Sequence, residues 1–594
     1  WRSRQSAASS LAELLSGRRF AEVEPFLERV WTASLRSVDD IKETVREAGK
    51  ALCRSTRGLT VRLCDAHHSN PAETRRTIGV VAPILLRQGL LSPVKEIQSL
   101  AMDVLMRVAK HAGSAEIRPF VPEMVKCLLE ALSSMEDSRL NYIEQHAPAI
   151  GMSAERLEHA RLQSSKASPM GETLDVLMGH VDEATMTELV PQLGSVLRSG
   201  VGLNTRAGTC RFISRLCLRR GSLVRPHAGK LFKALLAAAA ADKSQSVTSA
   251  AVSATAAVAR HATEARTHQL VQDVVSMYDS ASDDDSGSGD VASSEKRRAL
   301  ASHLALELSR NASDAVAKHA ASVLPLAFVG RFDDAESVAK RWQEVWEENA
   351  SGASSTLRLY LDEILAACAS RLGAAQYRVK RQGAAATAAA AKAAPQVVKP
   401  RATEMLRGLL AELPGRVWEG KQVVPGAVAD VLEACPECVV GAGARDEVVR
   451  ALVAEAGRKK AAYREAAIEA LRRALAALAP PAKTLRETET ENDAVASDAD
   501  FFPAVMPLLR ELLQPKPDPS RDPPGHAGST GGNTVAEMEA EAARVAAEAK
   551  TDDAVAILGL RCSATLCAGA TRDAIQSAAP ECASLAADEP IDDA

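Results

Sequence analysis

The chain has 594 residues, of which 46% are hydrophobic, 25% are charged and only 3% are aromatic. This length exceeds that of one compact domain, and scarce aromatic residues beside abundant alanine argue against a sheet protein and favour an all-α protein. A net charge of -4 is too weak a field to recruit nucleic acid or an anionic membrane, and no apolar run approaches the roughly 20 residues of a membrane span.

Amphipathic helices follow one another in pairs from the start of the chain. A helix over 21–36 is followed, after Ser37-Val38-Asp39-Asp40, by a second helix from 41 to about 63, and the two aspartates suit an N-cap at the positive end of its dipole. In the predicted helix 116–132, Pro119 and Pro122 lie near the start, where the first turn of a helix tolerates proline or the helix bends. The further predicted helices cover 116–132, 183–198, 203–219, 223–241 and 245–261.

The openings of the second helices suggest a repeat. Each has a β-branched, threonine or aromatic residue, then a polar residue, with alanine or glycine shortly after. Three of the five separations are close to whole multiples of about 42 residues, within the period of HEAT and armadillo units, and the other two need insertions. We therefore predict an all-α, right-handed α-solenoid of HEAT/armadillo-type helix pairs. The openings are at Val45, Ile97, Thr205, Val247, Val379 and Tyr463.

Three segments interrupt the helical pattern. Residues 280–294 are acidic and rich in Gly and Ser, 484–500 are acidic, and 514–533 are rich in Pro and Gly, so we expect mobile connections there. The predicted organisation is a HEAT-repeat solenoid over 1–279, an acidic disordered loop over 280–294, a continued solenoid over 295–483, flexible connections with a short helix over 484–533, and C-terminal helical repeats over 534–594.

Two groups of residues could suggest metal or redox chemistry. Cys435-Pro436-Glu437-Cys438 could be a redox pair or half of a zinc site, but the nearest other cysteines are Cys368 and Cys562, so an incidental pair at a helix end is favoured. His67-His68, near Cys64 and Asp65, could bind a metal, but Asn70-Pro71 follows, so a loop between helices is favoured.

Nucleotide and hydrolase motifs are missing from the sequence. The glycines of 200–208 lack the Lys-Ser/Thr pair of a phosphate-binding loop and follow no predicted strand. No G-x-S-x-G and no H-E-x-x-H string occurs. We therefore expect no enzymatic activity and name no catalytic, cofactor-binding or metal-binding residue.

Two surface candidates have a simpler alternative. Arg219-Arg220, Arg225 and Lys230 could face an acidic partner, although a solvated face is favoured. Trp342 and Trp346 lie one helical turn apart, and packing between repeats is favoured over a role as partner anchors.

The eleven cysteines are scattered, mostly among Leu, Val and Ala, where a thiol behaves as a small buried hydrophobe. This distribution favours a reducing compartment over a disulfide framework. The chain opens at Trp1 without a signal-peptide pattern, and we expect it to begin inside a longer protein.

Several strings resemble the C-terminal half of one family, the proteasome adapter and scaffold proteins. Their order and approximate spacing match that family from near Trp1 to about residue 479. The strings are VWTASLRSVDDIKETVREAGKALC at 30–53, ARLQSSKASPMGETLD at 160–175, ELVPQLGSVLRSGVGLNTRAG at 188–208, VLPLAFVG at 323–330, WQEVWEEN at 342–349, LRLYL at 357–361 and RVWEGKQ at 416–422. The acidic loop, the alanine-rich run at 384–394 and the tail after residue 514 depart from it.

This resemblance implies an armadillo-type solenoid that tethers the proteasome core particle to the regulatory particle and links it to other proteins, such as trafficking or quality-control factors. It implies no cofactor, no nucleic acid and no direct membrane insertion. The implied location is the cytoplasm and nucleus, with the endoplasmic reticulum or endosomes reached through partners. The alternative is a karyopherin-like or other HEAT-repeat receptor, because those proteins are also solenoids with acidic loops.

Overall fold

The computed structural model describes residues 1–134, 169–283, 291–440, 442–478, 501–513, 557 and 559–561. Every regular element in these ranges is a helix, as predicted for an all-α chain. The chain divides into two compact units. Unit 1 comprises Trp1–Val274 with Leu300–His319, and unit 2 comprises Val275–Ala299 with Ala320–Ala594. Two long helices, α16 (Glu264–Asp283) and α17 (Val291–Asn311), contribute residues to both.

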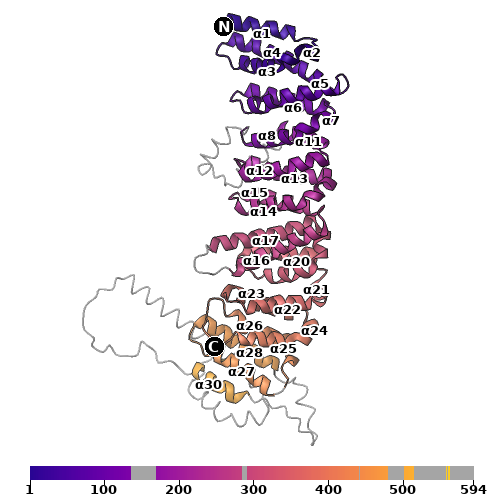
Figure 1. Cartoon of the computed structure of the whole chain (residues 1–594). Coiled ribbons are helices and arrows are strands. Elements are labelled where there is room, and N and C mark those ends of the chain that lie inside the picture. Colours follow the sequence, from indigo (N-terminus) through magenta and orange to yellow (C-terminus); the bar gives the residue numbers. More distant parts are fainter. Residues whose placement is uncertain are drawn as a thin grey trace, which may run out of the picture. The chain divides into compact units, whose positions relative to one another are not determined.

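Unit 1 consists of two layers of stacked helices (Figure 1). Hairpins such as α3 with α4, α12 with α13 and α14 with α15 join the layers, which is the helix pairing predicted from the sequence. The first layer holds α3 (Leu27–Val38), α5 (Pro71–Ile84), α8 (Val121–Ser134), α12 (Glu183–Ser199) and α14 (Ala228–Ala241). The second layer holds α1 (Arg2–Leu14), α4 (Glu43–Leu63), α6 (Lys95–His111), α11 (Pro169–His180), α13 (Leu203–Val224) and α15 (Gln245–Ala259).

Short elements lie between the long helices of unit 1. Proline explains three of them, because Pro25, Pro119 and Pro226 stand in short 3-10 turns that divide the predicted helices 21–36, 116–132 and 223–241. The short elements are α2 (Phe20–Val23), η1 (Glu24–Phe26), η2 (Leu85–Gly89), α7 (Ser114–Ile117), η3 (Arg118–Phe120), η4 (Arg225–His227) and α18 (Ser313–Lys318).

Unit 2 repeats the hairpin arrangement. The pairs α22 with α23, α25 with α26 and α27 with α28 pack together, and α23, α26 and α28 lie in succession in one layer. Its helices are α19 (Ala320–Gly330), α20 (Glu336–Asn349), α21 (Ala353–Leu359), α22 (Leu361–Leu372), α23 (Tyr377–Ala393), α24 (Pro395–Val398), η5 (Lys399–Arg401), α25 (Ala402–Ala411), α26 (Val423–Ala434), η6 (Pro436–Cys438), α27 (Ala442–Ala456), α28 (Ala461–Leu478) and α30 (Phe502–Leu513).

The predicted repeat position has one structural meaning throughout. In α4, α6, α13, α15, α23 and α28 it is the third residue of the helix, and its side chain is at most 4% exposed. The polar residue that follows binds the next repeat in two cases: Arg206 forms an ion pair with Asp242 at 3.1 Å, and Lys380 contacts Glu412. The pattern therefore marks where each second helix enters the core and confirms the HEAT-type solenoid; the hand of the stack stays a prediction.

Side-chain caps fix several helix starts. Asn70 accepts a hydrogen bond from the Ala72 N–H at 2.9 Å, and Asp182 accepts one from the Thr185 N–H at 2.9 Å. The predicted cap at Asp39-Asp40 is wrong. Helix α4 begins after Lys42 without a side-chain cap, because the Asp40 carboxylate instead accepts from the Lys42 N–H and binds Arg4 at 2.8 Å.

The predicted connections are shorter than expected where the structure describes them. α16 ends at Asp283 and α17 begins at Val291, so the prediction of a disordered loop is wrong for 280–283 and 291–294. A reason is visible in the core: Ser294 is 5% exposed, and its hydroxyl donates to the Ala281 carbonyl. Residues 284–290, 484–500 and 514–533 lie outside the described residues, as do 534–594 apart from four positions, and α30 is the short helix expected within 484–533.

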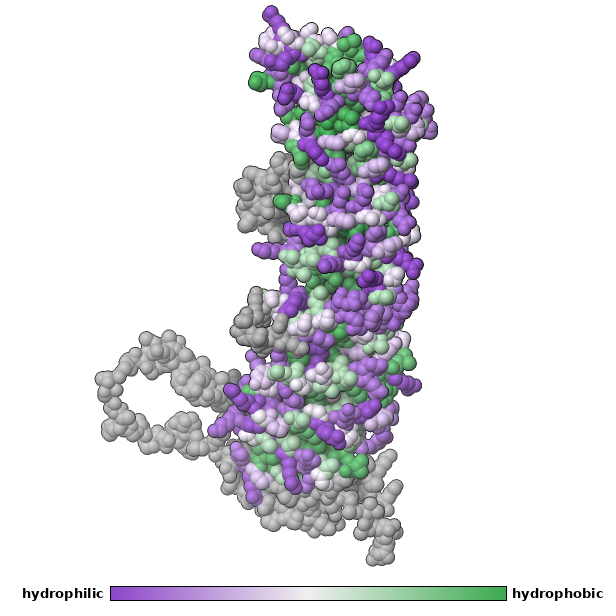
Figure 2. All heavy atoms as spheres, viewed as in Figure 1, coloured by the Kyte–Doolittle hydropathy of each residue, from purple (hydrophilic) through white to green (hydrophobic). Residues whose placement is uncertain are grey.

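The core is a continuous set of aliphatic side chains between the layers of each unit. Leu105 of α6 is 1% exposed, as expected of a core position. In the space-filling view, polar residues cover much of the visible face and apolar residues show through between them (Figure 2). No helix among the described residues is both long and apolar enough to cross a bilayer.

Candidate functional site

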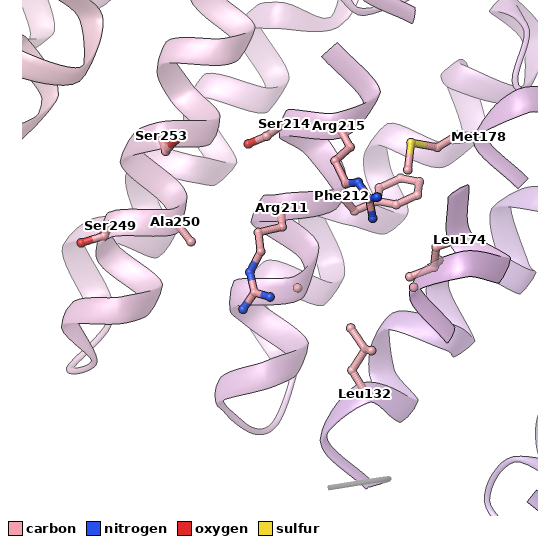
Figure 3. Close-up of a pocket in the computed structure, with 12 residues that line it drawn as sticks. Leu132, Leu174, Met178, Arg211, Phe212, Ser214, Arg215, Ser249, Ala250 and Ser253 are labelled. Atoms are coloured by element: carbon pink, nitrogen blue, oxygen red, sulfur yellow. The ribbon is translucent and has the colours of Figure 1, made fainter. Parts of the chain in front are cut away.

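A groove lies in unit 1 among α8, α11, α13 and α15 (Figure 3). Its volume is about 570 Å³, enough for several side chains of a bound segment. We name it the α13 groove. Its lining residues are Leu132, Gly171, Leu174, Met178, Gly208, Arg211, Phe212, Ser214, Arg215, Ser249, Ala250 and Ser253.

The floor of the α13 groove is apolar. Leu132, Leu174, Met178 and Phe212 belong to three different helices, and each is at most 7% exposed. Helix α11 is followed in its layer by α13, and small residues such as Gly208 line the space between them. Because these apolar groups already lie within the fold, they form a fixed surface against which a partner's apolar side chains could pack.

One wall of the groove is strongly basic. Helix α13 contains five arginines and no carboxylate. Arg211, Arg215 and Arg219 follow one another at four-residue intervals and so lie on one face of the helix. In the close-up, Arg211 lies between Ser249 and Ala250 of α15 and the two leucines of the floor (Figure 3).

A single carboxylate of α11 serves two of these arginines. One Asp175 oxygen, Oδ2, lies 2.5 Å from Nη2 of Arg215 and 3.6 Å from Nη2 of Arg219. Burial lowers the pKa of the Arg211 guanidinium, because removal from water disfavours its charge. Arg215 and Arg219 therefore share the one carboxylate of Asp175.

The flank of the groove formed by α15, which packs beside α13, carries no charge. Helix α15 (Gln245–Ala259) contains no Asp, Glu, Lys or Arg, and it presents Ser249, Ala250 and Ser253 to the groove. Along α13 the same face continues to Leu218, which is 73% exposed. The groove thus combines an apolar floor, one basic wall, one neutral wall and an exposed leucine near one end, which suits a segment that is apolar on one side and acidic on the other.

Unit 2 contains networks of polar and charged side chains that are buried in its interior. Arg298 of α17 and Asp333, after α19, are each 2% exposed and contact each other. Asp333 also accepts a hydrogen bond from the Tyr278 hydroxyl at 2.6 Å, and Gln382 donates to that hydroxyl at 2.9 Å. Four segments are joined in this way, so the network fixes their register and offers no open site.

A second buried network holds the loop between α25 and α26. Lys421 is fully buried, and its ammonium donates to the Leu413 carbonyl and lies 3.5 Å from Glu455. Glu455 in turn accepts from Tyr463 at 2.6 Å and from Arg458 at 2.8 Å. Burial lowers the pKa of Lys421. Every charged group here has a partner within the network, which indicates a structural role.

The Cys-x-x-Cys pair lies at the end of α26, as the favoured interpretation states. Cys435 is 3% exposed, and its thiol donates to the Pro395 carbonyl at 3.4 Å. Burial raises the pKa of Cys438 to about 11 and also raises the pKa of Cys435, so neither thiol is activated as a redox pair requires. Within the described ranges, no group of three or more His, Cys, Asp or Glu residues is placed to hold a metal ion.

Five other thiols are also buried, each at 3% exposure or less. Burial raises the pKa to about 12 for Cys53, Cys64, Cys210, Cys217 and Cys368. All eight cysteines among the described residues are free thiols.

The His67-His68 segment forms the turn that the favoured interpretation predicted. Asp65 accepts from the His67 N–H at 3.0 Å, and its other oxygen lies 3.0 Å from Nδ1 of His68. These hydrogen bonds lower the pKa of Asp65. Cys64 is fully buried within the fold.

The predicted basic cluster does not form one surface. Arg219 donates to the Asp175 carbonyl at 2.9 Å, and Arg220 donates to the Gly179 carbonyl, so both bind α11. Arg225 stands in η4, and Lys230 lies on α14 in the other layer. The sequence interpretation missed Arg211 and Arg215, although their spacing with Arg219 was a readable signal.

The tryptophan pair packs inside unit 2, as favoured from the sequence. Trp342 is fully buried with its ring centroid 5.3 Å from that of Tyr278, and Trp346 lies 5.0 Å from Phe328. A role for either ring as an exposed partner anchor is wrong.

Comparison with known proteins gives consistent results. The profile of the family described as proteasome adapter and scaffold protein ECM29, HEAT-repeat domain, matches residues 117–279, which include all four helices of the α13 groove. The chain is 32% identical over 485 residues to the human proteasome adapter and scaffold protein ECM29, covering 79% of this chain and 25% of that protein. It is 26% identical over 477 residues to the proteasome component ecm29 of Schizosaccharomyces pombe, covering 79% of this chain and 27% of that protein.

The chain therefore spans about a quarter of the length of the curated relatives it matches. Among solved structures, the karyopherin Kap121p bound to the extreme C-terminus of the protein phosphatase Cdc14p is similar, with a TM-score of 0.37 and 10% identity, covering 94% of this chain and 52% of that chain. Similarity at this level carries no conclusion about function.

Proposed function

We propose that the chain is a non-enzymatic scaffold segment that binds the proteasome. The proposal starts from the fact that the chain belongs to the family of the proteasome adapter and scaffold protein ECM29. In this role it tethers the core particle to the regulatory particle and links the assembly to other cellular proteins. The observation that carries the proposal is the 32% identity with the human adapter over 485 residues.

The physical properties of the fold support this role. Stacked helical hairpins bury their apolar faces against neighbouring hairpins, so their outer surfaces are available to partners. The relatives' printed names describe adapters and scaffolds, in agreement with a binding role.

A retrieval experiment tests the proposal. The purified, tagged chain is incubated with intact proteasomes in buffer that contains ATP, and bound subunits are quantified by mass spectrometry. We expect enrichment of subunits from both the core and the regulatory particle relative to tag alone. Enrichment of neither particle would refute the proposal for this segment, and enrichment of one alone would refute tethering.

We also propose a location in the cytoplasm and nucleus, with access to the endoplasmic reticulum or endosomes through partners. The free thiols among the described residues are compatible with a reducing compartment. Imaging of the fluorescently tagged full-length protein tests this, and a signal confined to the secretory lumen would contradict it.

A further inference from the structure

We propose that the α13 groove binds a helical segment of a partner protein that has apolar side chains on one face and carboxylates beside them. This inference deepens the proposed scaffold function and rests on it for the partner's place in the cell. The chemistry of the segment, however, is argued from the groove alone.

Charge complementarity defines the acidic side of the segment. Helix α13 has five arginines and no carboxylate, while α15, which packs beside it, has no charged residue at all. Of the neighbouring carboxylates, Asp242 pairs with Arg206, and Asp175 is shared by Arg215 and Arg219. A partner's carboxylate placed beside Arg215 and Arg219 would give these two guanidiniums, which share Asp175, a second anionic partner in a partly desolvated setting, where such pairs are stronger than in water.

The floor defines the apolar side. Leu132, Leu174, Met178 and Phe212 form a fixed surface, and Leu218 extends it outward at 73% exposure. Residues 211, 214, 215 and 218 recur at helical spacing, so the arginines and the exposed leucine lie on one face of α13. A bound helix that lies along α13 would therefore meet the basic and apolar groups together, as in helix-in-groove recognition.

The small neutral wall explains why a helix fits this space. Ser249, Ala250 and Ser253 occupy successive turns of α15 and keep that side shallow. A volume of about 570 Å³ accommodates a few large side chains of a helix, but not a whole domain.

A peptide titration tests the proposal with the full chain. The probe is a fluorescein-labelled peptide of about 14 residues, roughly 20 Å of helix, with Leu on one face and Glu on the others. Two matched peptides replace every Glu by Lys or every Leu by Ser. Fluorescence anisotropy should show saturable binding of the Leu/Glu peptide, about tenfold or more tighter than that of either matched peptide.

Two variants of the chain locate the binding. Arg211→Glu combined with Arg215→Glu reverses the charge of the wall, and Ser253→Trp fills the groove without a change of charge. Each should weaken binding of the Leu/Glu peptide about tenfold or more. Arg198→Glu on α12 makes the charge change of one of these two substitutions on an exposed residue of the other layer and should leave binding unchanged. Circular dichroism melts verify that all variants fold.

Several results would overturn the assignment. The first is no binding of the Leu/Glu peptide, and the second is equally tight binding of the peptide in which Ser replaces every Leu. The third is unchanged binding of the Leu/Glu peptide by the folded Ser253→Trp variant. The fourth is displacement of the Leu/Glu peptide by duplex DNA at equal charge concentration. Failed peptide binding by a chain that still retrieves proteasomes overturns the groove assignment and leaves the scaffold function standing. Specific peptide binding by a chain that retrieves no proteasomes upholds the groove and overturns the scaffold function alone.

Discussion

The two units bury polar side chains of different kinds. In the described part of unit 1 these are mostly Ser and Thr hydroxyls, with Asp242 as the charged member, whereas unit 2 buries Arg298, Arg371, Lys421 and Glu455. A hydroxyl in α3 or α4 donates to a carbonyl four residues earlier in its own helix, as Ser34 and Thr56 do at 2.7 and 2.9 Å. The charged groups of unit 2 instead depend on partners from other segments.

This difference teaches how each unit specifies its packing. A hydroxyl that is satisfied within its own helix places no demand on a neighbouring repeat. A buried guanidinium is stable only when a particular carboxylate reaches it, so unit 2 pairs its segments selectively but tolerates fewer substitutions. We expect the following experiments to sharpen or break this contrast, from the largest effect to the smallest.

Replacing Arg298 by alanine should have the largest effect. Asp333 would remain buried at 2% exposure without its guanidinium partner, and breaking such a buried pair typically costs about 3–5 kcal/mol. Urea unfolding followed by hydrogen exchange should locate the loss in unit 2. The double variant Arg298→Met with Asp333→Asn should recover part of the stability. A cost below about 1 kcal/mol for the single variant would contradict a tightly paired network.

Leu105→Ala in unit 1 should cost roughly 2–5 kcal/mol, because it removes a side chain that is 1% exposed and leaves a cavity. In a stack of repeats the damage should remain near α6, which packs against α4 and α11. Hydrogen exchange measured by mass spectrometry should show faster exchange in these helices first. Loss of protection throughout both units at once would refute such local behaviour.

Thr56→Val should cost only about 0.5–1.5 kcal/mol. The substitution keeps the shape of the side chain and removes the 3.0 Å contact of the Thr56 hydroxyl with the Ser34 hydroxyl, which retains its own bond to the Val30 carbonyl at 2.7 Å. Thermal melts of Thr56→Val and Arg298→Ala, compared directly, measure the contrast between the units. Equal losses in the two variants would break it.

Mild acid should produce the smallest effect, and in unit 1 alone. Burial lowers the pKa values of His227, His261 and His319 below the ordinary value for histidine, so the unfolded chain binds protons more readily than the folded one. Their contribution to stability is therefore present at neutral pH and decreases as pH falls below about 6.5. The described residues of unit 2 contain no histidine.

Hydrogen exchange at pH 7.5 and 5.5, corrected for the intrinsic rates, measures this difference unit by unit. The triple variant His227→Gln, His261→Gln, His319→Gln should lose the sensitivity of unit 1 to acid. An equal loss of protection in unit 2 would contradict the assignment to these imidazoles.

Much of the fold was predictable from local sequence, and the groove was not. Residues such as Val45 and Val247 mark helix openings because a buried β-branched residue recurs at one place in each hairpin. The α13 groove, by contrast, brings together Leu132 and Ser253, which are distant in sequence and share no pattern. The buried pairing of Arg298 with Asp333 could not be predicted either, because charged residues in a sequence normally indicate a solvated surface and only tertiary packing buries them.

The reactivity of the buried thiols reports how often the helices around them open transiently. Alkylating reagents attack the thiolate, and burial raises the pKa to about 12 for Cys53 and Cys210 in unit 1 and for Cys368 in unit 2. Each thiol therefore reacts mainly when the helices around it open by local unfolding. The alkylation rate measured at each native cysteine would therefore report how readily the helices around it open, without an engineered residue.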